Sequence, residues 1–554
     1  MTVLVVGGGP SGLATALFLA RAGVAVRLVE RRPGTSTLPR ATHVTRRTME
    51  LLREAGLQEA MAKAGFEVVA GSDPRALTDP DRVLPRTVVG VSSLSALDGA
   101  EVLETGEEEL AVPGPCPPFW CGQHRTEPLL REAAARAGAD IRFGEALTGL
   151  SVRDDGVVAR TRAGDGRTRT VTARYLIAAD GAHGWIPEAA GIARDGLGTI
   201  ARRTSILFRA DLTPLLKGRR FFMSMIENPG FSGAVMELDT DHRWAAAVES
   251  EAVGGPAGEP DPGRCLELVR AALGTGGIPV ELTATFHWQA RHRVAERYRE
   301  GPVFLVGDAA HLHPPAGGYG SNAGIQDAHN LAWKLAAVLH GWAGPALLDS
   351  YDAERRPIGI ATAEQALLLD GIPAERLGAE VSDPRTIAMG YRYRSAAVIG
   401  GPAGPGAPFP DTFELSGAPG TRLPHIPLPP GPDGRSGQGS TLDLCAPGAA
   451  GHRLLLLGCD DGWRRTAAEV AGELAVPLTA RILHPPVPLA RTCGTGPGGA
   501  LLVRPDGFVA WRCTAAALPT GARRHQVLAA SVRRILRTDA AGTGTHPLTL
   551  RSGR

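Results

Sequence analysis

The chain has 554 residues, of which 43% are hydrophobic and 21% charged, so it is long enough for three or four domains with their own cores. A formal net charge of +2 argues against nucleic acid or another polyanion as a partner. Seven scattered cysteines without a C-x-x-C pair fit a reducing cytoplasm, and the lack of an 18-residue apolar run argues against a membrane span or signal peptide.

The first thirty residues predict a nucleotide-binding unit of strand, glycine turn, helix and strand. An apolar run over 2–6 precedes Gly7-x-Gly9-x-x-Gly12, and leucines and alanines at helical spacing follow before a second strand that ends at Glu30. In such a turn Gly7 permits the bend, Gly9 lets backbone amides approach a pyrophosphate, and Gly12 lets the helix pack on the strand. Glu30 stands where a carboxylate accepts hydrogen bonds from ribose hydroxyls. The order of these parts favours a bound dinucleotide over an ordinary turn.

The middle of the chain continues the α/β pattern and then becomes rich in strands. We expect a helix over 127–137, hairpin strands over 147–175 and a strand that enters Asp180-Gly181. From 182 to 296, glycine and proline separate short strands. This region is placed to supply a sheet that covers a pocket.

A second glycine-rich loop follows the apolar strand 303–306. The run GDAAHLHPPAGGYGSN occupies 307–322 and leads into a helix that we expect from about Ser321 to Leu339. Asp308 is placed to bond a sugar-like polyol, and the loop with the helix N-terminus is placed to hold an anionic ring edge. A plain surface loop would explain neither the acid nor the helix start. The run therefore predicts a second part of the ligand site.

The last third of the chain predicts a linker and a small α/β domain. Residues 399–440 are dense in proline and glycine and poor in regular pattern, which is typical of a linker. Beyond it, strands and helices alternate up to a helix around 525–537. Their order is thioredoxin-like, but without a C-x-x-C motif redox exchange is not expected.

Taken together, the motifs resemble the class A flavoprotein monooxygenases, the fold of para-hydroxybenzoate hydroxylase. They look most like the aromatic polyketide hydroxylases of the aklavinone and tetracenomycin hydroxylase type, over nearly the whole chain. The motifs that carry this resemblance are VLVVGGGPSGLATALFLARAG, LVERRPG, PRATHVTRRTMELLREAGL, GQHRTEPLL, AADGAHG, the run from 303 to 339, YDAERRP, YRYRSAAV and LLVRPDGFVAWR.

The resemblance implies an α/β fold with a Rossmann-like FAD-binding domain of the GR2 type, a β-sheet substrate domain and a thioredoxin-like C-terminal domain. The FAD-binding domain would be discontinuous, with residues 70–120 partly on the substrate side. The expected boundaries are 1–181 with 296–398 for the FAD-binding domain, 182–295 for the substrate domain, 399–440 for the linker and 441–554 for the C-terminal domain.

The resemblance also implies a set of residues that bind FAD. Each matches a family motif near the pyrophosphate, the ribose, the ribityl chain or the isoalloxazine ring. The pyrophosphate and ribose set is Gly7, Gly9, Pro10, Ser11, Gly12, Glu30 and Arg31. The residues expected to reach the cofactor from other loops are Arg47, Gln123, Asp180, Asp308, Pro315, Gly317, Gly318 and Asn322.

The implied reaction hydroxylates a polycyclic aromatic polyketide in antibiotic biosynthesis. NADPH or NADH would reduce the flavin, O₂ would form a flavin C4a-hydroperoxide, and the protein would orient substrate and exclude water. One departure concerns the hydride donor: family members follow Asp-Gly-Ala with x-Ser-x-x-Arg, whereas this chain has HGWIP over 183–187. This makes the use of NADPH less certain than the binding of FAD.

Few acid–base residues and an apolar pocket are expected for such chemistry. No catalytic residue is assigned; His313 and Arg394 are candidates, while His311 is interpreted as a core residue and no metal is expected. For the substrate, strands of the β-rich region supply large apolar side chains, each of which has core packing as an equal alternative. They are Phe221, Phe222, Met223, Met225, Phe231, Met236 and Trp288.

Two other functions stay open on the residues alone. The same cofactor site would serve Baeyer–Villiger-type oxygen insertion or oxidative ring rearrangement of such a polyketide. It would also serve a non-catalytic flavoprotein that binds an aromatic antibiotic, an alternative that the altered segment after Asp180 keeps open. A monomer or homodimer in the cytoplasm is expected.

Overall fold

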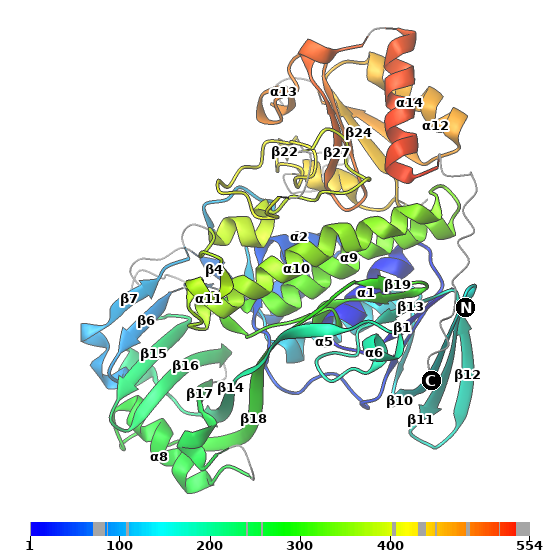
Figure 1. Ribbon diagram of the computed structural model, residues 1–554. Helices are drawn as coiled ribbons and strands as arrows, with labels where there is room; N and C mark the ends of the chain where they lie inside the picture. The colour runs from blue at the N-terminus through cyan, green and yellow to red at the C-terminus, as the bar shows by residue number, and fades with distance from the viewer. Residues whose placement is uncertain are drawn as a thin grey trace.

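The computed structural model describes residues 2–69, 83–85, 87–106, 110–239, 242–255, 259–401, 406–429, 439–448, 451–483, 488–519 and 521–538. Its centre is a six-stranded sheet in the order β19-β20-β13-β1-β2-β9, parallel except for the edge strand β19 (Figure 1). The strands are β1 Val3–Val6, β2 Val26–Glu30, β9 Asp140–Phe143, β13 Tyr175–Ala178, β19 Arg299–Glu300 and β20 Val303–Leu305. Continuous apolar runs form the inner strands because both faces of the sheet are covered.

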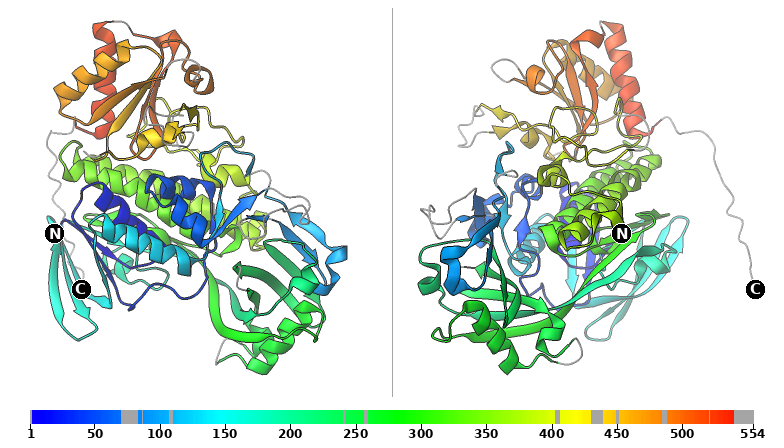
Figure 2. Two further views of the ribbon diagram at one scale, coloured as in Figure 1. Left: turned by 180° about the vertical axis from the view of Figure 1, so that it is seen from behind. Right: turned by 60° about the vertical axis from the view of Figure 1, so that its left-hand side comes forward.

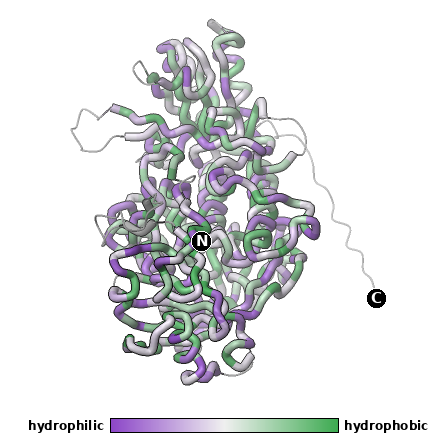
Figure 3. Tube along the Cα trace, turned by 90° about the vertical axis from the view of Figure 1, so that its left-hand side faces the viewer, coloured by the Kyte–Doolittle hydropathy of each residue, from purple (hydrophilic) through white to green (hydrophobic). Residues whose placement is uncertain are grey.

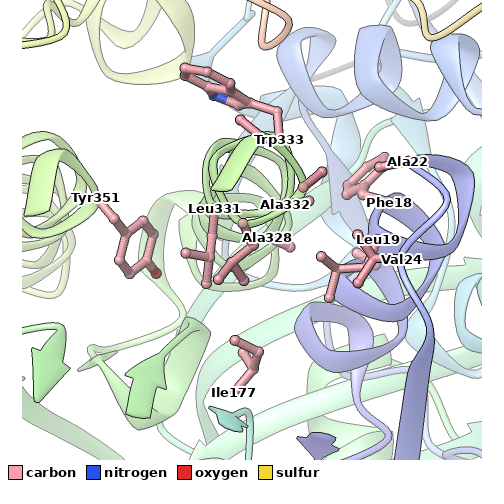
Figure 4. Close-up of a cluster of buried hydrophobic side chains, with 14 of the residues drawn as sticks. Phe18, Leu19, Ala22, Val24, Ile177, Ala328, Leu331, Ala332, Trp333 and Tyr351 are labelled. Atoms are coloured by element: carbon pink, nitrogen blue, oxygen red, sulfur yellow. The ribbon is translucent and has the colours of Figure 1, made fainter. Parts of the chain in front are cut away.

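Long helices pack beside this sheet and fill the main core. They are α1 Pro10–Arg21, α5 Gln123–Arg136, α9 Tyr319–Leu339 and α10 Asp349–Leu369. Between α1 and α9, Phe18 and Leu19 lie near Ala328 and Ala332, with Ile177 of β13 close by (Figure 4). Small alanines on α9 let the two helices approach closely. The predicted helix starts are each within a few residues of these bounds, since helix ends are the least regular part of the pattern.

A second large sheet has eight strands in the order β21-β18-β14-β17-β16-β15-β6-β7. They are β6 Val88–Val91, β7 Glu101–Glu104, β14 Arg194–Arg209, β15 Met223–Asn228, β16 Phe231–Asp239, β17 Arg243–Glu249, β18 Glu281–Ala295 and β21 His311–Leu312. Helix α8 Pro262–Leu273 packs on one face. Strands β6 and β7 belong to this sheet, so part of the 70–120 segment joins it; residues 70–82, 86 and 107–109 are outside the described part.

Smaller elements complete this half of the molecule. An antiparallel three-stranded sheet consists of β10 Glu145–Arg153, β11 Gly156–Ala163 and β12 Thr168–Ala173. A further sheet, in the order β3-β8-β4-β5, consists of β3 His43–Val44, β4 Phe66–Val69, β5 Val83–Pro85 and β8 Phe119–Trp120. The short helices are α2 Arg46–Glu54, α3 Gln58–Ala64, α6 Ile186–Ala189, α7 Thr213–Leu216 and α11 Ala374–Leu377.

The C-terminal domain lies over α9 and α10 (Figures 1 and 2). Its mixed sheet, in the order β25-β24-β26-β27, carries helices α12 and α14. Its elements are β24 Leu454–Gly458, α12 Gly462–Leu474, β25 Leu478–Ile482, α13 Leu489–Thr492, β26 Ala500–Val503, β27 Val509–Cys513 and α14 Ala522–Leu536. The thioredoxin-like order stays a prediction, and residues 539–554 lie outside the described part.

The segment before this domain has little regular structure but is not loosely attached. Strands β22 Pro427–Leu428 and β23 Gly439–Ser440 are its regular pieces among the residues described, while Arg422 and Leu423 are fully buried.

Along the trace in Figure 3, hydrophobic and hydrophilic stretches alternate. Among the described helices, none combines the length and apolar character that a membrane crossing requires.

Candidate functional site

The first glycine turn is closed on one side and open on the other. Gly7 has φ +115°, and a Cβ there would lie 2.0 Å from the Ala179 carbonyl oxygen; a Cβ at Gly12 would lie 2.0 Å from the Gly7 oxygen. At Gly9, by contrast, a Cβ would have no atom of the described residues within 4 Å. Gly9 is also the N-cap of α1, with Pro10 in its first turn. The helix N-terminus therefore faces open space where an anionic group would be stabilised.

Two carboxylates stand beside this turn. Glu30 accepts hydrogen bonds from the backbone N–H groups of Gly8 (2.7 Å) and Arg32 (2.8 Å), which hold its side chain at the end of β2. Glu127 accepts from the Gln123 amide at 2.6 Å, and burial together with the nearby Glu30 raises the pKa of Glu127. One N–H of the Gln123 amide therefore holds the Glu127 carboxylate near Glu30. The exposed Arg31 follows Glu30.

Asp308 lies at the bottom of a recess at the end of β20. Protein atoms surround it closely enough for burial to raise the pKa of its carboxyl group, yet much of its side-chain surface is accessible. Arg40 acts electrostatically on both Asp308 and Glu127, and its guanidinium lies 6.0 Å from the Phe286 ring centroid. Arg40 thus lies near Asp308, Glu127 and the eight-stranded sheet. The sequence pattern did not distinguish Arg40 from Arg47, which belongs to the same PRATHVTRRT motif.

The second glycine loop has the backbone that its sequence predicts. Gly317 and Gly318 have φ of +76° and +68°, and Gly318 is the N-cap of α9. The exposed Pro315 precedes them. Ser11 links this loop to the first one, because a Cβ at Gly307 would lie 2.3 Å from the Ser11 hydroxyl. The Ser11 side chain therefore packs between loops, and its backbone is what faces the first turn.

Two predicted cofactor contacts need correction. Arg47 donates to Glu50 at 3.1 Å and to the Asp506 carbonyl at 2.8 Å, so its guanidinium lies in the contact with the C-terminal domain. The Asn322 amide is fully used inside the protein: its oxygen accepts from Thr45, and its nitrogen donates to the carbonyls of His43 and Gly318. Asn322 therefore ties two loops together, and its side chain has no donor left for a ring.

The altered segment after Asp180 lies near several arginines. The Asp180 carboxylate accepts from the Ile186 N–H at 3.0 Å, and burial raises its pKa; its other oxygen finds no hydrogen-bond partner within the described part of the chain. Burial lowers the pKa of His183, and the positive charge of Arg291 lowers it further. The arginines that surround His183 are Arg291, Arg31, Arg194 and Arg293. Trp185 in this segment is 42% exposed.

The two faces of the eight-stranded sheet separate the predicted substrate residues. Phe231 is 2% exposed and packs in the cluster under α8, as does Phe221, so both belong to the core rather than to a pocket. Met236 packs on the opposite face, where Phe286 and Leu38 also lie. Strand alternation puts three more predicted residues on that face: Met223, Met225 and Trp288. Phe222 instead packs against Trp120, with ring centroids 3.6 Å apart.

The histidines and the arginine considered for acid–base chemistry lie in different surroundings. His313 donates from Nδ1 to the Pro314 carbonyl (3.0 Å), and burial together with His311 lowers its pKa to about 4. His311 is buried and bonds Asp327 at 2.8 Å, which agrees with its interpretation as a core residue. The Arg394 guanidinium lies against Gly406. No group of three or more metal-ligating side chains occurs among the described residues.

Comparisons with known proteins agree with this geometry. Residues 1–366 match the family model described as FAD binding domain, and residues 416–538 match aromatic-ring hydroxylase, C-terminal. The chain is 43% identical over 523 residues to the tetracenomycin B2 monooxygenase-dioxygenase of Streptomyces olivaceus, covering 92% of this chain and 94% of that one. It is 41% identical to the tetracenomycin A2 monooxygenase-dioxygenase of Streptomyces glaucescens, covering 98% of each.

A solved structure shares the whole architecture. It is the ternary complex of aklavinone-11 hydroxylase with FAD and aklavinone, which superposes with a TM-score of 0.82 at 34% identity and covers 97% of this chain and 99% of that one. The protein is accordingly an FAD-dependent monooxygenase that consumes NAD(P)H and O₂. The chain belongs to the family of FAD-dependent aromatic-ring hydroxylases.

Proposed function

We propose that the enzyme hydroxylates a polycyclic aromatic polyketide in antibiotic biosynthesis. The observation that carries this proposal is the apolar face of the eight-stranded sheet opposite α8. It presents Met236, Phe286 and Trp288 toward the side where Leu38 and Arg40 approach from the FAD-binding domain. A broad apolar face of this kind suits a fused-ring substrate and keeps water away from the reacting atoms.

The residues of the cofactor recess fit FAD. The open edge at Gly9 and the N-terminus of α1 would hold the pyrophosphate, Glu30 the ribose and Asp308 the ribityl hydroxyls. The backbone of Pro315–Gly318 would lie against the ring system. Bound FAD supplies the oxygen-transfer chemistry, while the protein binds, orients and excludes water. Because burial lowers the pKa of His313 to about 4, the ring is neutral at pH 7 and does not act there as an imidazolium that donates a proton to the substrate.

The setting of the enzyme follows from the same features. We propose that it works in the cytoplasm, since all seven cysteines are free thiols that an oxidising compartment would endanger. We also propose the following domain boundaries: an FAD-binding domain over 1–181 and 296–398, a substrate domain over 182–295, a linker over 399–440 and a C-terminal domain over 441–554. A monomeric or homodimeric state is proposed as well.

The test is aerobic oxidation of NADPH and of NADH by the yellow holoprotein, with and without tetracyclic and pentacyclic polyketides. Stimulated consumption together with a product heavier by one oxygen atom and still carrying its carbonyl groups is the expected result. An oxygen inserted next to a carbonyl, giving a lactone, would instead favour Baeyer–Villiger chemistry. Tight binding of a polyketide without any stimulated turnover would contradict the proposed reaction.

A further inference from the structure

The turn between β26 and β27 of the C-terminal domain enters the FAD-binding domain. Arg504, which is fully buried, donates to both carboxylate oxygens of Glu354 on α10, at 2.5 and 2.8 Å. It also bonds Asp506 in its own turn. Glu354 accepts further hydrogen bonds from Lys334 (2.7 Å) and Ser395 (2.6 Å). In Figure 1, α9 and α10 lie directly below this domain.

This cluster is balanced in charge and therefore stable in one geometry. Its two cations, Arg504 and Lys334, face two carboxylates, Glu354 and Asp506, and all four side chains are buried. Although burial opposes ionisation, Arg504 and Lys334 lower the pKa of Glu354, so its charge persists at neutral pH. Paired buried charges tolerate little displacement, because a shift would leave one of them without its partner.

The neighbouring residue of α10 connects the cluster to the flavin loop. Arg355 donates to Asp327 at 2.7 Å, and the other oxygen of Asp327 accepts from the Gly307 N–H at 3.1 Å and from His311 at 2.8 Å. Gly307 immediately precedes Asp308. Because Glu354 and Arg355 are adjacent on one rigid helix, a fixed position of Glu354 also fixes Arg355. Two sets of buried charged contacts, joined through the backbone of α10, thus link Arg504 to the backbone at Gly307.

We propose that Arg504 is a positioning residue for the cofactor. Through Glu354, Arg355 and Asp327 it holds the backbone from Gly307 to His311 in the shape that FAD requires. The proposal relies on the FAD dependence of the enzyme and not on the identity of the polyketide. It gives the C-terminal domain a role in flavin binding at a distance.

The test compares Arg504→Gln with Asp443→Asn. The control removes an ion pair with Arg53 (3.0 Å) in the contact between the same two domains, but a partly exposed one that does not touch α10. Apoprotein is titrated with FAD, and hydrogen exchange is followed over 307–312. Arg504→Gln is expected to weaken FAD binding about 10-fold and to speed exchange in that segment, whereas Asp443→Asn should change neither.

Unchanged FAD affinity and exchange in Arg504→Gln would overturn the proposal, as would equal losses in both variants. If Arg504→Gln does not fold, Arg504→Lys provides the test, because it keeps the charge but cannot bridge both oxygens of Glu354 and Asp506. Arg504→Lys is expected to lose less FAD affinity than Arg504→Gln and to exchange faster than wild type over 307–312. Wild-type values for both measurements in Arg504→Lys would again contradict the proposal.

Discussion

Two regions near the cofactor recess differ in how their side chains are arranged. The turn from Gly7 to Gly12 is built from adjacent residues and leaves its outer edge open, because a ligand has to reach the backbone. The contact below the C-terminal domain is built from residues far apart in the chain, such as Glu50, Arg422 and Arg504, and buries their charges completely. Side chains are absent at the open edge of the turn at Gly9, and paired where two domains must keep one arrangement. The two regions should therefore fail in different ways when altered.

The largest effect is expected for Gly12→Ala. Its Cβ would lie 2.0 Å from the Gly7 carbonyl, so strand and helix must separate, and both FAD affinity and apoprotein stability should fall, the affinity by more than about 100-fold. Gly9→Ala is the control, since its Cβ points into open space: apoprotein stability should stay close to wild type while FAD binding weakens. Thermal unfolding of apoprotein and FAD titration separate the two. Equal apoprotein stability in both variants would contradict the packing argument.

Breaking the charge cluster is the next largest change. Glu354→Gln leaves Arg504 and Lys334 without their shared carboxylate, which should lower the free energy of unfolding by about 3–5 kcal/mol. Because the folded-state pKa of Glu354 is lowered, its stabilisation is present above its unfolded pKa and is lost as the pH falls; the variant should therefore unfold with a weaker acid dependence. Asp443→Asn should cost less than about 1 kcal/mol. Urea unfolding at several pH values measures both.

These two regions also differ in how far the sequence alone predicts them. Gly7, Gly9, Gly12, Glu30 and Asp308 could be identified because a local motif requires a particular backbone, and the motif is contiguous in the chain. The position of Arg47 could not, because its partners, Glu50 and Asp506, are 3 and 459 residues away and nothing in the local pattern indicates the second.

The substrate sheet shows the same limit in another form. Strand periodicity separates the two faces of β16 but does not tell which face a helix covers, so Phe231 and Met236 looked equivalent in the sequence. Only the position of α8 distinguishes them. Asn322 lies in the loop that the motif indicates. Its side chain, however, donates hydrogen bonds to the carbonyls of His43 and Gly318, which come from two segments, and the local sequence does not show this.

Asp308→Asn should have an intermediate effect: it should weaken FAD binding but slightly stabilise the apoprotein. Loss of the charged acceptor should weaken FAD binding about 10-fold. Burial raises the folded-state pKa of Asp308, so its contribution to stability is present at low pH and is lost as the pH rises through that pKa. At neutral pH the variant apoprotein should therefore be slightly more stable than wild type. A variant that binds FAD less well and is also less stable at pH 7 would contradict this assignment.

A smaller effect should distinguish the two faces of the sheet. Phe231→Leu should destabilise the protein by about 1 kcal/mol without changing substrate affinity, because the side chain packs under α8. Met236→Leu should leave stability nearly unchanged but alter the KM for the polyketide, since it lies on the face toward Leu38. Urea unfolding and steady-state kinetics test the pair. A change of KM in Phe231→Leu alone would reverse the assignment of the faces.

The smallest effect on catalysis is expected for His313→Gln. With a pKa of about 4, the wild-type ring is neutral between pH 6 and 8, so the pH dependence of kcat/KM should keep its shape over that range. Stability should respond instead: a folded-state pKa below the ordinary value of about 6.5 gives stability above the unfolded pKa that is lost as the pH falls toward 4. The variant should therefore lose less stability than wild type between pH 7 and 5, by on the order of 1 kcal/mol. If kcat/KM of the wild type changes between pH 6 and 7 and this change disappears in His313→Gln, the ring takes part in proton transfer. If the pH dependence of kcat/KM is unchanged and the stability of the variant varies less with pH, the ring instead supports the flavin loop from behind.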